Sequence, residues 1–410
     1  ETKPMDFSLS DDQRRWGRIA RKFAYETVRP RARELDRLAD PAATFPHDLV
    51  LEASRLGLRT LRIPKEYGGA GVDCLTEVVV QEELTAGDVG FGMTLQHAWR
   101  EGYILATATT DAQRERFLPV FMNDDSCLMS FAITEEHSGS DHKTLFDGTL
   151  EAGPRTRAVR DGDHWVIDGA KKFITNGNVA TFIILVARTD PGVAWHEGIS
   201  VFVVPTDTPG FRVASVLDKV GIRLNQNTEL VFENCRIPAD NLLSEVNGGH
   251  AFLARFAAGS MAKEGAKALG VARAALEQAF AYAKQRVQGG KPIIEHQAIN
   301  QLLCDLATDI ELARTLVWRA AWAVENAPDQ APRLEAMAKL ASTEAAARVG
   351  VRALEICGGV GVLKDHPMEK LARDGISMLH AGVGNHALRE SMAGNLAAQT
   401  PACLAVDFGD

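Results

Sequence analysis

The spacing of hydrophobic and polar residues changes twice along the chain, which divides it into three zones. In residues 5–125, apolar residues recur every three to four positions, as on one face of an amphipathic helix. The first such stripe covers residues 16–28, and Ser10 with Gln13 forms a capping-box pattern just before it. This zone predicts an N-terminal helical domain, broken by a glycine-rich turn at residues 63–71.

Residues 126–240 have a different period. Short apolar runs at 164–167, 181–186 and 199–204 are bounded by Asp-Gly, Asn-Gly and Pro-Gly pairs, which favour turns between strands. We expect this zone to form a middle β domain with a barrel-like sheet.

Residues 241–400 return to the helical period and are rich in alanine. One apolar stripe covers residues 269–283 and a second covers residues 299–317. A proline-containing loop at 326–332 separates them from a third helix, expected at about 333–356. Long antiparallel helices with short loops are typical of a four-helix bundle. The predicted fold class is therefore α+β and mainly α: a helical domain, a β domain and a helical bundle.

Composition excludes several classes of protein. The chain carries 54 acidic against 45 basic residues, whereas a nucleic-acid-binding protein normally presents a basic face. No apolar run in the sequence reaches membrane-spanning length and the N-terminus has no signal-peptide pattern, so we expect a cytoplasmic protein. The six cysteines are scattered, without a CxxC pair, which favours reduced thiols over disulfides or a metal site.

A set of short motifs extends over most of the chain. They are IPKEYGGAG at 63–71, AITEEHSGSD at 132–141, DGAKKFITNG at 168–177, KVGIR at 219–223, TELVFENCRIPADN at 228–241, RVQGGKPIIEHQ at 286–297, GGVG at 358–361 and RD at 373–374. Each motif is weak alone. Together, in this order, they resemble the acyl-CoA dehydrogenase superfamily, and the resemblance implies that family's fold, an acyl-CoA substrate and FAD.

The resemblance also implies where the flavin ring lies. Phe131, Ile133 and Thr134 match the segment along the ring, and Phe173 and Thr175 match the strand on its other side. Threonine hydroxyls suit this position because they can donate hydrogen bonds to flavin heteroatoms and so tune the electron sink.

In this family a neighbouring subunit completes the flavin site, which implies a homotetramer, a dimer of dimers. Arg286 and Gln297 match these positions, and a guanidinium binds pyrophosphate bidentately. Without the resemblance, Arg286 would be interpreted as a cation at a helix C-terminus. Glu355 replaces a usual glutamine, and Val383 replaces a hydroxyl residue. The remaining positions matched to the cofactor are Gly358, Gly359 and Asn385.

The usual catalytic base of the family is missing. That base is a Glu in a Tyr-Glu-Gly-Thr-like turn, where this chain has Ala381. A minority of members place the Glu on the first bundle helix, at the position of Ser260, and here Met261 replaces the arginine that follows. Since neither alanine nor serine is a suitable base, a base would have to come from another residue.

Glu264 is the leading candidate. It lies four residues after Ser260, so both share a helix face that borders the substrate pocket in relatives. A carboxylate there would be partly desolvated, with its pKa raised towards a value useful for a base. The alternative is a structural ion pair with Lys263 or Lys267 on a solvated or interface face.

Two histidines are further candidates, since imidazole can act as a base near neutral pH. His380 stands in place of the usual tyrosine beside Ala381, and His97 lies in a segment that matches the acyl end of the pocket. The alternative for both is a packing or ligand-orienting role.

Substrate contacts are predicted at Gln96, Ser140 and Ser260, and Ser140 also counts among the residues of the cofactor site. After Ser140, residues 142–154 form an insertion relative to the family pattern. Lys143 within it suits a CoA phosphate; the alternative is a surface extension of no consequence for ligand binding.

These features lead to three hypotheses. The first is an FAD-dependent acyl-CoA dehydrogenase with a relocated base, acting on a cyclic or branched acyl group in lipid or acid degradation. An electron-transfer flavoprotein would then accept the electrons. The second is a flavin enzyme of the same fold with oxidase, monooxygenase or desulfinase chemistry. The third is a catalytically degenerate paralogue that binds flavin or CoA.

Overall fold

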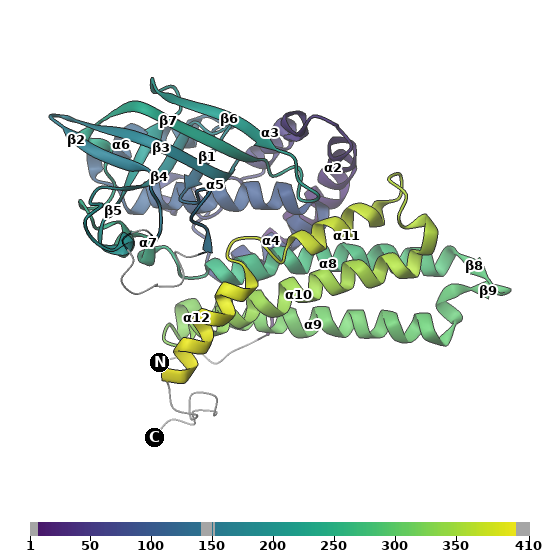
Figure 1. Ribbon diagram of the computed structural model, residues 1–410. Helices are drawn as coiled ribbons and strands as arrows, with labels where there is room; N and C mark the ends of the chain where they lie inside the picture. The colour runs from purple at the N-terminus through teal and green to yellow at the C-terminus, as the bar shows by residue number, and fades with distance from the viewer. Residues whose placement is uncertain (1–6, 141–149, 151, 399–410) are drawn as a thin grey trace.

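The N-terminal part of the chain is helical, as predicted (Figure 1). The computed structural model describes residues 7–140, 150 and 152–398, and all structural statements concern these residues. The helices are α1 (Asp11–Phe23), α2 (Arg29–Asp36), α3 (His47–Arg55), α4 (Cys74–Gly87), α5 (Val89–Thr107) and α6 (Asp111–Asn123). The predicted capping box is confirmed: the Gln13 N–H donates to Ser10 Oγ at 3.2 Å, and the Ser10 N–H donates to Gln13 Oε1 at 2.8 Å.

The middle part is a curled sheet of seven strands. The strands are β1 (Met129–Ala132), β2 (Arg157–Asp161), β3 (His164–Thr175), β4 (Phe182–Arg188), β5 (Ile199–Pro205), β6 (Phe211–Leu217) and β7 (Asn227–Pro238). Their order is β1-β4-β2-β3-β7-β6, with β5 paired to β4. β1 runs parallel to β4, whereas β3 pairs antiparallel with both β2 and β7. The predicted β domain is therefore present, and the short helix α7 (Gly249–Arg255) follows it.

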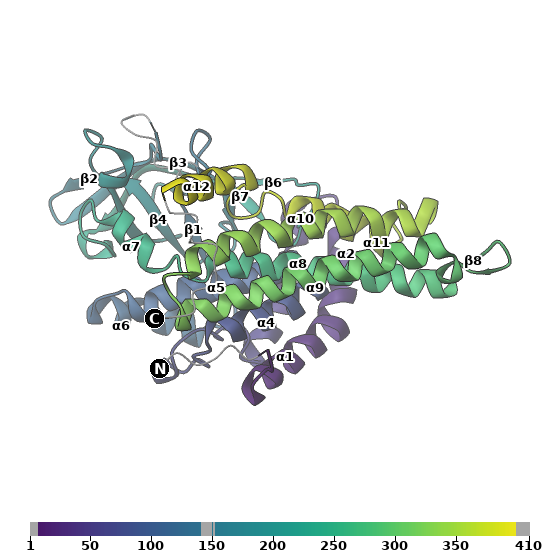
Figure 2. The ribbon, with the colours of Figure 1, turned by 90° about the horizontal axis from the view of Figure 1, so that it is seen from below.

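The C-terminal part is a bundle of long helices. It comprises α8 (Ser260–Gln285), the hairpin β8 (Val287–Gln288) and β9 (Lys291–Pro292), α9 (Gln297–Asn326), α10 (Ala331–Cys357), α11 (Pro367–Ser377) and α12 (Asn385–Ala398). Figures 1 and 2 show α8, α9 and α10 side by side, with α11 lying along α10. The third predicted helix begins two residues earlier than expected, because Pro332 is accommodated in the first turn, where its missing N–H costs nothing.

Three apolar cores hold these parts together. One joins the N-terminal helices to strands β1, β4 and β5. A second is formed mainly by residues of the strands themselves, and the third fills the bundle. The bundle core is built largely from alanine, which allows α8 and α10 to approach closely. Helix α4 packs across α8, so the N-terminal part and the bundle meet along that helix (Figure 1).

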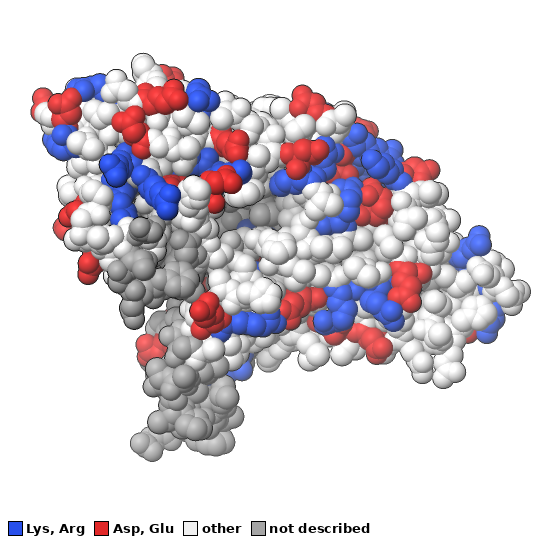
Figure 3. Space-filling view, in the orientation of Figure 1, with Lys and Arg blue, Asp and Glu red and all other residues white. Residues whose placement is uncertain are grey.

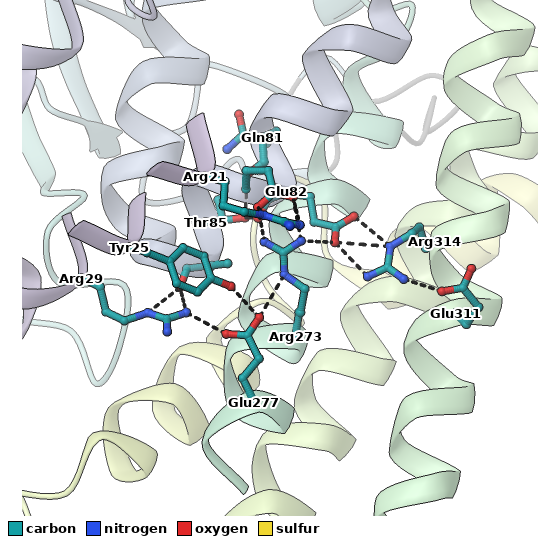
Figure 4. Close-up of polar contacts among 12 residues, drawn as sticks. Arg21, Tyr25, Arg29, Gln81, Glu82, Thr85, Arg273, Glu277, Glu311 and Arg314 are labelled. Atoms are coloured by element: carbon teal, nitrogen blue, oxygen red, sulfur yellow. Dashed lines mark hydrogen bonds and ion pairs between the residues drawn. The ribbon is translucent and has the colours of Figure 1, made fainter. Parts of the chain in front are cut away.

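A buried ionic network reinforces that junction (Figure 4). Arg273 of α8 donates to Glu82 at 3.0 Å and to Glu83 at 2.6 Å, both on α4. Arg21 of α1 also binds Glu83, at 2.7 Å, and Arg314 of α9 binds Glu82 at 2.9 Å. Four helices from the two ends of the chain therefore share one set of charges.

The surface seen in Figure 3 mixes acidic and basic side chains, without a large patch of one sign on the face shown. Among the described helices, none is both long enough and apolar enough to cross a membrane.

Candidate active site

The first turn of α8 is held by a carboxylate from another helix. Gly259 precedes α8 with a φ of 78°, a left-handed conformation that glycine tolerates. Glu335 of α10 accepts the backbone N–H of Gly259 at 2.9 Å and that of Met261 at 3.0 Å, where a helix N-terminus favours an anion. Ser260, predicted to contact substrate, begins this turn and is half-buried.

Glu264 lies one turn further along α8, inside the protein. It is 9% exposed, and its Oε1 accepts a hydrogen bond from Lys267 Nζ at 2.7 Å. Lys267 is fully buried and also donates to Oε1 of Gln96 on α5 at 3.2 Å. Oε2 of Glu264 is buried and has no hydrogen-bond partner among the described residues. One oxygen of this carboxylate is therefore fixed, and the other is available.

The expectation that Glu264 has a raised pKa is wrong. Burial acts to raise the pKa of this carboxyl group, but the charge and hydrogen bond of Lys267 and the charge of Lys339 outweigh it and hold the pKa below its ordinary value. The structural alternative is correct about Lys267 as the partner. It is wrong about the environment, because the pair is buried rather than on a solvated face. Lys263 pairs with Glu77 instead, at 3.3 Å.

The turn that carries Ala381 covers Glu264. Gly382 has a φ of 67°, and a Cβ placed on it would lie 3.1 Å from Cδ of Glu264. The carboxylate on α8 therefore lies against the turn that the family resemblance predicts to be the base position. The turn itself is anchored from α10, because Lys339 Nζ donates to the carbonyl oxygen of Val383 at 2.7 Å and to Oδ1 of Asn385. Burial lowers the pKa of Lys339 to about 8.

Val383 and Asn385 were both assigned to the cofactor. In the structure Val383 packs in a small apolar cluster, and the Asn385 amide is bound to Lys339, Thr343 and Glu344. These contacts lie within the chain, and the assignment of both residues to the cofactor stays a prediction.

Ser140 connects this turn to the sheet domain. Its Oγ accepts the backbone N–H of Gly384 at 3.1 Å, although the two residues are 244 positions apart. Ser140 and Glu264 therefore both border the turn at 380–384, Ser140 at Gly384 and Glu264 at Gly382. The site combines the middle domain, α5, α8 and the turn after α11. The insertion at 142–154 is described only in part, and Lys143 lies outside the described residues.

The two histidine candidates differ from Glu264 in their surroundings. His97 is joined to Glu101 at 3.1 Å and to Arg100 at 3.1 Å, and burial lowers the pKa of its imidazole. The guanidinium of Arg100 lies over the ring of Phe131, 4.7 Å from its centroid. His97 is thus part of a packed ionic cluster behind the flavin-ring segment. His380 is exposed on the turn next to Ala381.

The two segments matched to the flavin ring lie side by side. The Lys172 N–H donates to the carbonyl oxygen of Thr134 at 2.9 Å, and Ser130 Oγ donates to the carbonyl oxygen of Thr175 at 2.7 Å. Phe173 has a φ of 60° and is 56% exposed. A large ring turned outward by a strained backbone fits a surface that a planar ligand covers. Ile133 is half-buried beside Thr134. These residues fit the ring of a flavin.

The residues matched to the pyrophosphate end lie elsewhere in the same chain. Arg286 follows the last residue of α8, so it is separated from Glu264 by about 33 Å of helix at 1.5 Å per residue. Gln297 begins α9 after the hairpin, and both side chains are exposed. The hairpin β8–β9, which lies between these two residues in the chain, is at the end of the bundle away from the sheet in Figure 1.

The exposed glycines that end α10 lie on the same bundle as Arg286. Gly358 has a φ of 59°, and a Cβ added to it or to Gly359 would meet no atom within 4 Å, which leaves their backbone open to a ligand. Glu355 is exposed and pairs with Arg352, one turn away on α10. The residues matched to the flavin ring therefore lie on the sheet domain, whereas those matched to its pyrophosphate end lie on the helical bundle.

Family profiles match the chain in three consecutive parts. The acyl-CoA dehydrogenase N-terminal domain matches residues 10–125, the middle domain 130–235 and the C-terminal domain 251–389. The chain belongs to the acyl-CoA dehydrogenase family. It is therefore an oxidoreductase of the class that acts on CH–CH bonds of acyl-CoA.

Relatives in this family cover nearly the whole chain. An acyl-CoA dehydrogenase of Bacillus subtilis is 35% identical over 368 residues, 89% of this chain and 93% of its own length. The solved butyryl-CoA dehydrogenase of Megasphaera elsdenii is 32% identical with a TM-score of 0.87, covering 96% of this chain and 100% of its own. The glutaryl-CoA dehydrogenase of Mycobacterium smegmatis, solved in complex with FADH2, is 26% identical with a TM-score of 0.85, covering 95% and 96%.

Three site residues were missed by sequence reasoning. Lys339, Glu335 and Arg100 are charged residues inside helices, where the sequence gives no sign of what they contact. A weak signal existed for Lys339, because a lysine within an alanine-rich apolar stripe is unusual unless its charge is satisfied.

Proposed function

We propose that the protein is an FAD-dependent acyl-CoA dehydrogenase that forms the α,β double bond of an acyl-CoA thioester, with Glu264 as the base. The observation that carries this proposal is the position of the Glu264 carboxylate. It lies against Gly382, beside Ala381, with Oε2 unpaired. A carboxylate thus lies close to the usual base position, but on helix α8 instead of in the turn.

The residues of this chain suggest how the α-proton would be removed. Oε2 of Glu264 accepts the proton, while Oε1 stays bound to Lys267. The electron pair of the broken C–H bond forms the double bond as hydride leaves the β-carbon. Because Glu264 approaches from α8 rather than from the turn, it suits an acyl group that presents its α-proton from another angle, such as a branched or cyclic one.

FAD would supply the acceptor for the hydride that leaves the β-carbon. Phe131, Ile133, Thr134, Phe173 and Thr175 would hold its ring. Arg286, Gln297, Gly358 and Gly359 would hold its pyrophosphate end from a second copy of the chain. The family resemblance implies this division and a tetramer, and the helix length between Glu264 and Arg286 supports a site shared by at least two copies.

Substrate binding would involve both sides of the turn at 380–384. Ser140 and Ser260 would contact the thioester ligand, and Gln96 would border its acyl end beside Lys267. An electron-transfer flavoprotein remains the proposed partner for reoxidation.

Anaerobic mixing of the purified protein with acyl-CoA thioesters tests the proposal. We expect at least one member of a straight-chain, branched and cyclic panel to bleach the flavin absorbance, while the free acids and free CoA leave it unchanged. If every thioester leaves it unchanged although they bind, the dehydrogenase proposal fails. Rapid consumption of O2 by the reduced protein, with an oxygenated product, would indicate the second hypothesis instead.

A further inference from the structure

Lys267 is the residue that gives the Glu264 carboxylate its direction. We propose that it is a positioning residue of the reaction: held between Gln96 and Glu264, it fixes one carboxylate oxygen and leaves the other to meet the α-proton. The inference rests on the proposed role of Glu264 as the base, and it deepens that role by assigning a residue that acts through Glu264.

The geometry places Lys267 between two helices. Its ammonium group donates to Glu264 Oε1 on its own helix at 2.7 Å and to Gln96 Oε1 on α5 at 3.2 Å. Lysine side chains usually move among many rotamers, but this one is fully buried and bound at its tip from two directions. The carboxylate that it binds is therefore held in one orientation.

An unpaired carboxylate oxygen does not by itself identify a base. Glu77 of α4 is paired with Lys263, which lies on α8 one turn before Lys267. It also has a buried oxygen without a partner among the described residues. Glu264 differs because its carboxyl carbon lies beneath Gly382, next to the position where the family keeps its base. Leaving a buried acceptor unpaired is costly, and here a substrate proton would occupy it.

The charges around the pair favour an ionised carboxylate. Lys267 and Lys339 both lower the pKa of Glu264, against the effect of burial, and His97 contributes in the same direction. Burial lowers the pKa of Lys267, and Glu264 opposes that shift. The charged or titratable groups that face the pair are Lys263 on α8, His97 and Arg100 on α5, and Lys339 on α10.

Removing the ammonium group has a predictable sign. Without Lys267, burial would dominate and the pKa of Glu264 would rise. Since only the ionised carboxylate accepts a proton, the acid limb of the rate–pH profile would then move to higher pH. The same change would release Oε1, so the fraction of carboxylates oriented towards the substrate would fall.

The test compares Lys267→Met with Lys263→Met, because both remove a buried, ion-paired lysine from the same helix. The two readouts are flavin reduction by the best thioester of the panel and deuterium uptake from D2O at the α-carbon of a thioester without β-hydrogen, such as 3,3-dimethylbutanoyl-CoA. For Lys267→Met we expect kcat to fall about tenfold or more and KM to change little. The acid limb of the rate–pH profile should move to higher pH by about one unit in both readouts. Lys263→Met should keep the wild-type limb.

Each result decides between the two claims. An unchanged acid limb in Lys267→Met, or an equal shift in both variants, overturns the positioning role. If Glu264→Gln keeps α-deuterium uptake, the base assignment itself is wrong. If Glu264→Gln abolishes uptake while Lys267→Met leaves the profile unchanged, the base role of Glu264 holds and the positioning role of Lys267 does not.

Lys267→Arg is the second variant, should Lys267→Met fail to fold, because it retains the charge in a bulkier group. A wild-type acid limb with reduced kcat in Lys267→Arg supports the proposal, and a wild-type kcat contradicts it.

Discussion

At the scale of the residue, the site depends on a glycine as much as on its charged groups. Gly382 adopts a φ of 67°, and its missing side chain makes room for the Glu264 carboxylate. Alanine there would meet Cδ at 3.1 Å and would also strain the backbone. The close approach therefore links the shape of the turn to the position of the proposed base.

We predict that Gly382→Ala lowers both stability and activity. The backbone alone should cost about 1–2 kcal/mol, and the contact with Glu264 should add to this. Gly162→Ala is the matched control, since Gly162 has a φ of 55° and open space around it. Thermal unfolding and flavin reduction measure the two effects. Equal stability losses in both variants, with full activity in Gly382→Ala, would contradict the contact.

Sequence reasoning at this scale works from motifs and helix spacing. It points to Ala381 as the empty base position and to Glu264 as its replacement, and both assignments stay predictions. It predicted the wrong pKa direction for Glu264, because it weighed burial alone, whereas Lys267 on the same helix and Lys339 on α10 together outweigh burial. Contacts between distant helices are not encoded in local spacing.

At the scale of the element, α4 and α8 depend on buried charges for their junction (Figure 4). Arg273 is placed between Glu82 and Glu83, and burial would lower its pKa if these carboxylates did not raise it. Glu83 has a lowered pKa, because Arg21 and Arg273 outweigh its burial. Such a network stabilises the fold only while both signs are present.

We predict that Arg273→Met destabilises the protein by about 1.5–3 kcal/mol at neutral pH, because Glu82 and Glu83 each lose one cation and keep only Arg314 and Arg21. Arg212→Met, which breaks an exposed pair with Glu233, should cost less than about 1 kcal/mol. Denaturant unfolding measures both.

The same network predicts a pH dependence. A depressed carboxyl pKa gives stability that is present above its ordinary value, about 4.3 for Glu, and is lost as the pH falls through the folded value. The difference between wild type and Arg273→Met should therefore shrink in acid. A difference that stays constant from pH 7 to pH 3 would show that the Glu83 ion pair is not its source.

The elements themselves were predictable because their signals are local. Ser10 and Gln13 set the start of α1, and Asp-Gly, Asn-Gly and Pro-Gly pairs mark the turns between strands. The sheet order was not predictable, since the parallel pairing of β1 with β4 joins segments about 50 residues apart without any local signature.

At the scale of the whole molecule, the residues predicted to bind flavin lie in two different parts of the fold, the sheet domain and the helical bundle. In one chain, α8 alone puts about 33 Å of helix between Glu264 and Arg286, which supports our proposal that a second copy completes the site. Flavin retention should then depend on assembly. A separated single chain should therefore lose its flavin.

We predict that Arg286→Gln reduces the flavin retained through gel filtration by about tenfold or more, while the subunit remains folded. Arg319→Gln, a change at another exposed arginine of the bundle, should retain flavin as the wild type does. Light scattering should give at least twice the mass of one 44.5 kDa chain. A monomer with full flavin content would contradict the shared site.

The most direct test of the account is α-deuterium uptake by Glu264→Gln, compared with Glu77→Gln, which changes the buried carboxylate of α4 that pairs with Lys263 of α8 and with Arg62. Deuterium incorporated from D2O into a thioester without β-hydrogen reports proton removal without any transfer of hydride. We predict that Glu264→Gln loses uptake by about a thousandfold or more, within the effect expected for a general base, while Glu77→Gln retains it. Uptake at the wild-type rate in a folded, flavin-loaded Glu264→Gln protein would contradict the account.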